Sequence, residues 1–345
     1  MSPVGHAEEA ILIPGAMPFK QINPIAPVVA NTYPDIGKYF HADATPQLIE
    51  YSQDPLMSNR ALRDGATRTI ATARSTDGDL VIIGESMGSM VAWRAAEGLV
   101  GDQDAPARNV RVVLIAPPEA GVAEYFREGT YIPVLNYRIT RIRDTGHPTA
   151  VVIGEYDGWS DPPDRPWNVI ASANALAGIV YVHGPTSFTV DPADVPAQNI
   201  TTRGSVTTYL APTSNLPLTQ VFRDVGVPDP VVDKADELLR PIVDAGYLRH
   251  DEPGDTRPYL RDGAIRRDVA GPQHARPPLR QRIARAVDDF RDRRAHRREA
   301  RHDIRNASRD TFTSAPTTKR QRSVERQPQP HRAAAGDSPG DSHTE

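Results

Sequence analysis

Apolar residues along this 345-residue chain form short β-branched runs that alternate with longer stretches of helical spacing. The short runs predict buried strands at Ala10–Ile13, Leu80–Ile83, Val110–Ile115 and Thr149–Ile153. Helical spacing occurs between these runs, over Arg60–Ala73 and from Met87 to Leu99. Because strands that alternate with helices indicate a doubly wound, mostly parallel sheet, the pattern predicts an α/β fold.

The pattern is less regular in the second half of the chain. Asn168–Leu176 has helical spacing, and the β-branched run Ile179–Val182 predicts a further short strand. Pro228–Tyr247 carries a helical apolar face that Pro241 interrupts. We therefore expect residues 205–250 to form a flap or a helical segment that packs beside the main body.

The composition changes after about Tyr259. Gln281–Ile304 is dense in arginine with a thin apolar stripe, which predicts a solvated helix, and the polar stretch after Ser308 predicts disorder. We expect an α/β domain over residues 1–260 and an Arg-rich, Pro-containing tail over residues 261–345. The formal net charge is −4, but residues 265–345 hold 19 basic and 11 acidic side chains, so the tail carries about +8 and the body about −12.

The pentapeptide Gly84-Glu85-Ser86-Met87-Gly88 lies between a predicted strand and a predicted helix. A G-x-S-x-G sequence in this position is typical of the nucleophile elbow, a sharp turn that lifts the serine hydroxyl out of the sheet. Glycine two residues before and after the serine fits the close approach of strand and helix there. The turn would leave the Met87 N–H near a helix N-terminus, where it can help to bind an oxyanion.

A second oxyanion donor is expected in the loop after the first strand, Pro14-Gly15-Ala16-Met17. The candidate donors are the amides of Ala16 and Met17, whereas Pro14 and Pro18 have no N–H and cannot serve. An ordinary β-turn punctuated by proline and glycine is the alternative interpretation of this loop.

Acid and base candidates follow the serine in the order that hydrolase sheets use. Asp157 and Asp161 come directly after the strand Thr149–Ile153, and we favour Asp157 because a carboxylate at the sheet edge can orient a histidine. Asp161 is the alternate acid, or a cap of the following helix. His183 follows the predicted strand Ile179–Val182 and is the candidate base; a plain surface-loop histidine is the alternative.

Several classes of chemistry find no support in the sequence. There is no cysteine, which excludes disulfides, thiolate catalysis and thiolate metal sites. No H-E-x-x-H pattern or phosphate-binding glycine loop is present, so we expect no metal and no cofactor. The N-terminal residues lack a basic segment followed by a long apolar run, and no stretch approaches the roughly 18 apolar residues of a membrane span. As written, the chain is expected to be cytoplasmic; export by another route or a phage origin are the alternatives.

Six segments together resemble the PE-PPE domain, a mycobacterial family of cutinase-like serine α/β-hydrolases. In chain order they are ILIPGAMPF, VIIGESMGSMVA, GEYDGWSDPP, NALAGIVYVHG, TTYLAPTSNLPLTQVFRDVG and LLRPIVDAGYLR, over roughly residues 9–250. The resemblance implies esterase or acyltransferase chemistry on acyl esters, including lipid or cell-wall esters. It carries over Ser86, His183 and one of Asp157 and Asp161 as a catalytic triad. The Arg-rich tail is outside the family pattern.

Two functions of different class follow from these features. The first is a serine esterase or acyltransferase that works through an acyl-enzyme. The second is a non-catalytic binding or structural protein, such as a phage or cell-envelope component, in which the basic tail contacts an anionic surface or nucleic acid. Ester turnover after deletion of the tail near residue 260 would separate the two.

Overall fold

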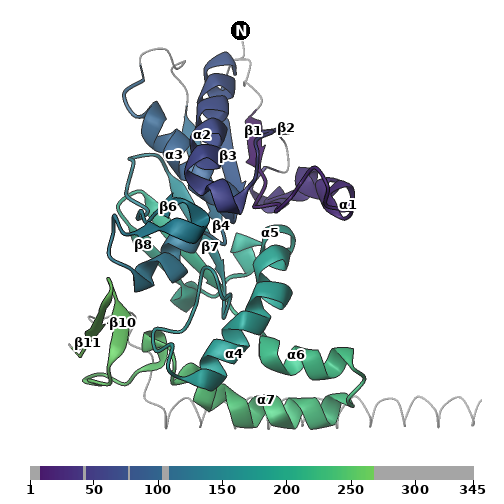
Figure 1. The fold of residues 1–345 in the computed structure, drawn as a ribbon, viewed down its shortest axis with the longest axis vertical. Helices are drawn as coiled ribbons and strands as arrows, with labels where there is room; N and C mark the ends of the chain where they lie inside the picture. Colours follow the sequence, from purple (N-terminus) through teal and green to yellow (C-terminus); the bar gives the residue numbers. More distant parts are fainter. Residues whose placement is uncertain (1–7, 42–43, 77, 103–108, 268–345) are drawn as a thin grey trace, which may run out of the picture. The chain divides into compact units, whose positions relative to one another are not determined.

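The computed structural model describes residues 8–41, 44–76, 78–102 and 109–267. Its centre is a seven-stranded sheet in the order β2-β1-β3-β4-β7-β9-β8 (Figure 1). Adjacent strands are parallel except for the antiparallel pair β8–β9, so the predicted α/β fold with a mostly parallel sheet is confirmed. The strands are β1 Glu9–Ile13, β2 Thr45–Leu48, β3 Leu80–Glu85, β4 Val110–Ile115, β7 Thr149–Gly154, β8 Ile200–Arg203 and β9 Val206–Ala211.

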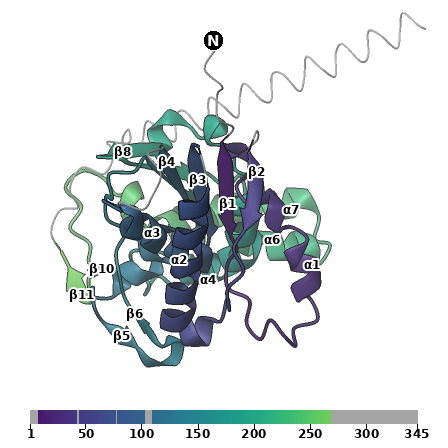
Figure 2. The same cartoon turned by 90° about the horizontal axis from the view of Figure 1, so that it is seen from above.

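Both faces of the sheet are covered, which explains why its central strands are continuous apolar runs rather than alternating ones. On one face, Ile11, Ile13 and Ile82 pack with residues of α2 and α3, which lie side by side (Figure 2). On the other face, Leu12 and Ile83 pack among residues that precede β2 or follow α5. The helices are α1 Ala26–Ala30, α2 Ser58–Ser75, α3 Met87–Leu99, α4 Val169–Gly178, α5 Gly184–Thr189, α6 Pro217–Asp224 and α7 Asp229–Asp244.

The turn from β3 into α3 has the geometry that the G-x-S-x-G sequence predicts. Ser86 has φ 52° and ψ −120°, a backbone conformation that few non-glycine residues adopt. A Cβ on Gly84 would lie 2.2 Å from the Gly88 carbonyl oxygen, and one on Gly88 would lie 2.0 Å from the Ile13 carbonyl oxygen. Glycine at both positions therefore lets the start of α3 press directly against β1 and β3.

The prediction of a strand at Ile179–Val182 is wrong. Ile179–His183 is a π-helical turn that joins α4 to α5. A short apolar run without periodicity fits a buried helix as well as a strand, so pattern alone could not separate the two. The local sequence favours the helix: Asn168 caps α4 by accepting the Ala171 N–H, and Gly178 allows the helix to press against the Tyr156 carbonyl oxygen.

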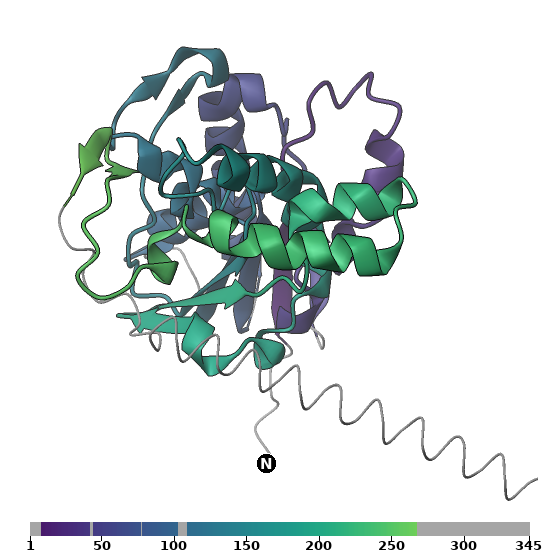
Figure 3. The same cartoon turned by 90° about the horizontal axis from the view of Figure 1, so that it is seen from below.

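Residues 205–250 divide between the sheet and a helical pair. Val206–Ala211 is β9, hydrogen-bonded to a strand on each side, whereas α6 and α7 pack beside α4 (Figure 3). Pro241 lies inside α7, as the sequence indicates. Two small antiparallel pairs complete the described elements: β5 Tyr131–Ile132 with β6 Tyr137–Arg138, and β10 Tyr259–Arg261 with β11 Ala264–Arg266.

The domain boundary expected after residue 260 falls within the β10–β11 hairpin. This hairpin is hydrogen-bonded to the body, since the Leu260 N–H donates to the Asp164 carbonyl and the Asp262 N–H to the Glu124 carbonyl. The helix and the disorder expected in the tail lie beyond the described residues. Among the helices of the described ranges, none combines the length and the apolar character that crossing a bilayer requires.

The backbone contact at the elbow can be tested by two glycine substitutions. Gly88→Ala is expected to cost more than about 2 kcal/mol of unfolding free energy, because the new Cβ would overlap two carbonyl groups. Gly184→Ala is the matched control: its Cβ position is open and its backbone is helical, so stability should rise or change by less than about 1 kcal/mol. Urea unfolding measures both, and equal stabilities would contradict the contact.

Candidate active site

Ser86, His183 and Asp157 meet at the carboxyl-end edge of the parallel strands, although up to 97 residues separate them along the chain. The Ser86 Oγ lies 2.8 Å from the His183 Nε2, and the His183 Nδ1 lies 2.7 Å from the Asp157 Oδ2. The serine comes from the elbow, the histidine from the π turn and the aspartate from the loop after β7. Such a chain of contacts can move a proton from a hydroxyl to an imidazole whose tautomer a carboxylate fixes.

The Asp157 carboxylate is fully buried and held by three donors. Besides the histidine, the Trp159 N–H donates to Oδ1 at 2.9 Å and the Ser160 hydroxyl donates to Oδ2 at 2.5 Å. These bonds satisfy a charge that would otherwise be costly to bury, and they fix the plane of the carboxylate toward the imidazole. The sequence analysis did not identify Ser160, because nothing distinguishes its pattern from that of an ordinary loop serine.

Asp161, the alternate acid, has other partners. Its Oδ2 accepts the Tyr156 N–H at 2.7 Å, and its Oδ1 accepts Arg249 Nη1 at 2.6 Å. Burial raises the pKa of Asp161 to about 7, while the neighbouring Arg249 guanidinium opposes the rise. Asp161 thus closes the loop that carries Asp157, and the structure does not bring it to His183. Arg249 lies 88 residues away in sequence, so no local pattern could identify this ion pair.

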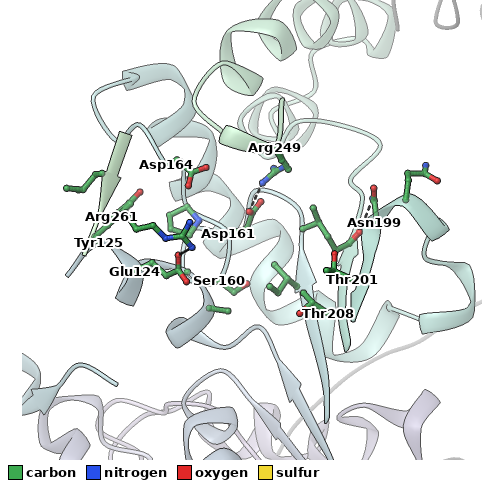
Figure 4. Close-up of a pocket in the computed structure, with 17 residues that line it drawn as sticks. Glu124, Tyr125, Ser160, Asp161, Asp164, Asn199, Thr201, Thr208, Arg249 and Arg261 are labelled. Carbon is green, nitrogen blue, oxygen red and sulfur yellow. Dashed lines mark hydrogen bonds and ion pairs between the residues drawn. The ribbon is translucent and has the colours of Figure 1, made fainter. Parts of the chain in front are cut away.

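A cavity of about 240 Å³ is lined in part by Ser160 and Asp161 of the loop after β7 (Figure 4). Ser160, Asp161 and Arg249 form part of one wall, and Thr201 and Thr208 lie across from them. Neither Ser86 nor His183 lines this cavity, so it is separate from the reacting atoms. It meets the site only through Ser160, whose hydroxyl also binds Asp157.

The two candidate oxyanion donors of the loop after β1, the N–H groups of Ala16 and Met17, differ in their hydrogen bonds. The Met17 N–H donates to the Gln53 carbonyl oxygen at 2.9 Å and is therefore already used. Within the described part of the chain, the N–H of Ala16 donates to no acceptor, and neither does the N–H of Met87, the first residue of α3. The arrangement can therefore offer two amide donors near the serine, Ala16 and Met87, but not Met17.

Comparison with known proteins identifies a matching domain family and several mycobacterial relatives. The sequence model of the PE-PPE domain matches residues 38–248. Three relatives come from Mycobacterium tuberculosis H37Rv. The SL1278 acyltransferase Chp1 is 31% identical, covering 71% of this chain and 65% of the relative. The diacyltrehalose acyltransferase Chp2 is 36% identical over 61% and 62%, and the esterase PE16 is 32% identical over 50% and 34%. The chain thus spans less than two thirds of the length of each.

The bond from Ser160 to Asp157 leads to a stability prediction. Ser160→Ala is expected to lower the unfolding free energy by about 1.5–3 kcal/mol, because it removes a donor from a fully buried carboxylate. Ser75→Ala is the control, since the Ser75 hydroxyl bonds an exposed carbonyl and should contribute less than about 0.5 kcal/mol. Denaturant unfolding of both variants provides the comparison, and a Ser160 effect no larger than the Ser75 effect would contradict this account.

Proposed function

The chain belongs to the PE-PPE domain family, and on this premise we propose that it is a serine hydrolase or acyltransferase of carboxylic esters. Ser86 is the nucleophile, His183 the general base and Asp157 the residue that orients the histidine. The observation that carries the proposal is the unbroken contact of 2.8 Å and 2.7 Å through these three side chains. The relatives named as acyltransferases and as an esterase support the same general chemistry.

The reaction proceeds in two acyl-transfer steps. The His183 Nε2 takes the Ser86 proton as Oγ attacks the ester carbonyl carbon, and the carbonyl oxygen becomes an oxyanion. The protonated histidine then gives its proton to the leaving alkoxide, so an alcohol departs and an acyl-Ser86 ester remains. In the second step His183 deprotonates water, in hydrolysis, or an acceptor hydroxyl such as that of a sugar, in acyl transfer. The deprotonated oxygen attacks the acyl-Ser86 carbonyl, the acyl group leaves as a carboxylic acid or a new ester, and the protonated His183 gives its proton to the departing Ser86 Oγ, which restores the hydroxyl.

The Met87 and Ala16 amides stabilise the oxyanion. The Met87 N–H stands at the N-terminus of α3, where the helix dipole favours negative charge. Both amides are fixed before the substrate arrives, so they need no rearrangement as charge develops. Each such donor is worth about 3 kcal/mol in the transition state.

Exposed apolar residues on the helical segment that carries His183 favour a substrate with an acyl chain. Val169, Leu176 and Val180 are each about 70% exposed. Their spacing of seven and four residues puts them along one face of α4 and the π turn, in the same continuous helix as His183. An exposed apolar face on the helical segment that carries the base suits lipid or cell-wall acyl esters, which is consistent with the diacyltrehalose named for Chp2.

Labelling of the nucleophile tests the proposal. A fluorophosphonate probe should label the wild-type chain and Ser75→Ala alike, and it should not label Ser86→Ala, because the phosphonate bonds the activated hydroxyl. Hydrolysis of p-nitrophenyl butyrate should fall at least 10³-fold in the same variant. Equal labelling of Ser86→Ala and the wild type would refute the assignment.

The identity of the acid can be tested by a matched pair of substitutions. Asp157→Asn should lower kcat by about 10⁴-fold, because the amide favours the wrong imidazole tautomer. Asp161→Asn keeps an acceptor for the Tyr156 N–H and should lower kcat by less than about 10-fold. Circular dichroism checks that both variants fold. A folded Asp161→Asn variant as slow as Asp157→Asn would show that the acid has been assigned wrongly.

A further inference from the structure

Four hydrogen bonds hold the backbone of the loop Pro14–Met17. The Tyr51 hydroxyl donates to the Pro14 carbonyl at 2.7 Å. Gln53 binds the loop twice. Its side-chain Nε2 donates to the Gly15 carbonyl at 2.7 Å, and its backbone carbonyl accepts the Met17 N–H at 2.9 Å. The remaining bond is from the Gly15 N–H to Glu85 Oε2, at 3.2 Å. These four bonds surround the Ala16 amide, which is left without an acceptor among the described residues.

The loop lies directly against the nucleophile. A Cβ on Gly15 would stand 3.1 Å from the Ser86 Cβ and 3.2 Å from Glu85 Oε2. At this distance a small movement of the loop changes where the next amide, that of Ala16, points relative to the Ser86 hydroxyl. The bond from Gly15 to Glu85 is therefore the contact best placed to fix the orientation of the Ala16 N–H.

Glu85 is a partly buried acid that the proton relay does not use. Burial raises its pKa, while the charge of His183 and the Gly15 N–H oppose the rise. Tyr33 and Tyr51 are the other titratable groups near it. Partial burial of a carboxyl is costly unless it makes a specific hydrogen bond, and the bond that the structure gives Glu85 is to the loop. This points to a positional role for its oxygen rather than a role in proton transfer.

We propose that Glu85 and Gln53 are positioning residues that hold the loop Pro14–Met17 so that the Ala16 N–H is the second oxyanion donor. Glu85 fixes the N–H side of Gly15, and Gln53 fixes its carbonyl side. Among the described residues, neither side chain is hydrogen-bonded to the Ser86 Oγ or to the His183 ring; both act through the backbone of the loop. The inference rests on the proposed function, because an oxyanion forms only if Ser86 attacks an acyl carbonyl.

If Glu85 positions the loop, then catalysis requires its oxygen as a hydrogen-bond acceptor but does not require its negative charge. Glu85→Gln retains an oxygen for the Gly15 N–H, whereas Glu85→Met fills similar space without an acceptor. With p-nitrophenyl butyrate, Glu85→Met should lower kcat about 10²-fold with KM within about 3-fold, because the donor acts mainly on the developing oxyanion. Glu85→Gln should keep kcat within about 5-fold of the wild type. Equal losses in the two variants would overturn the proposal, since the charge would then matter instead of the bond.

A double-mutant cycle with Gln53→Met gives an independent test. If both side chains act through one loop, Gln53→Met should also lower kcat at nearly constant KM, and the double variant should be little slower than the slower single variant. Multiplicative losses would mean that the two residues act separately and would overturn the proposal. Thermal unfolding checks that each variant folds. If Glu85→Met does not fold, kcat and KM of Gln53→Met still test the proposal. A wild-type chain without turnover or fluorophosphonate labelling would instead reject the proposed function.

Discussion

The contact of backbone on backbone at Gly84 and Gly88 is the constraint on which the rest of the site depends. With no side chain at either position, the start of α3 presses against β1 and β3, and the chain must turn within one residue. That residue is Ser86, which is forced to a positive φ that costs about 1–3 kcal/mol in isolation. The same contact sets the Met87 amide beside the serine hydroxyl and brings the end of β1, with its loop, against the elbow. Nucleophile, helix terminus and loop are thus parts of one packing arrangement.

The parallel sheet explains how residues so far apart in sequence come together. Strands β1, β3 and β7 end at the same edge, so the loops that follow them share one surface. The loop after β1 brings the Ala16 amide, that after β3 the serine, and that after β7 the aspartate. His183 does not follow a strand; it lies on the π turn between α4 and α5. The surrounding bonds, from Ser160 to Asp157 and from Asp161 to Arg249, hold the loop after β7 as firmly as Tyr51, Gln53 and Glu85 hold the loop after β1.

Much of this arrangement could be predicted from sequence because it is encoded locally. The apolar runs at β1, β3, β4 and β7 are long enough to identify, and the two glycines around Ser86 mark the elbow. Asp157 and His183 could be proposed from chain order alone. What the sequence left open depends on contacts between distant residues. Asp161 binds Arg249, and the Met17 N–H binds the Gln53 backbone carbonyl; neither distant partner has a local pattern. The strand predicted at Ile179–Val182 is helical in the structure, because four apolar residues fit either geometry.

The π turn at Ile179–His183 has a consequence for how this chain can change over evolutionary time. A π turn holds one residue more than the regular helix on either side of it. Loss of a single codon here would restore an uninterrupted α-helix and rotate everything on one side of the deletion by about 100° relative to the other. The imidazole would then leave the serine while the sheet and its core stayed as they are. A single deletion would thus separate His183 from Ser86 and Asp157 without replacing any of these three residues.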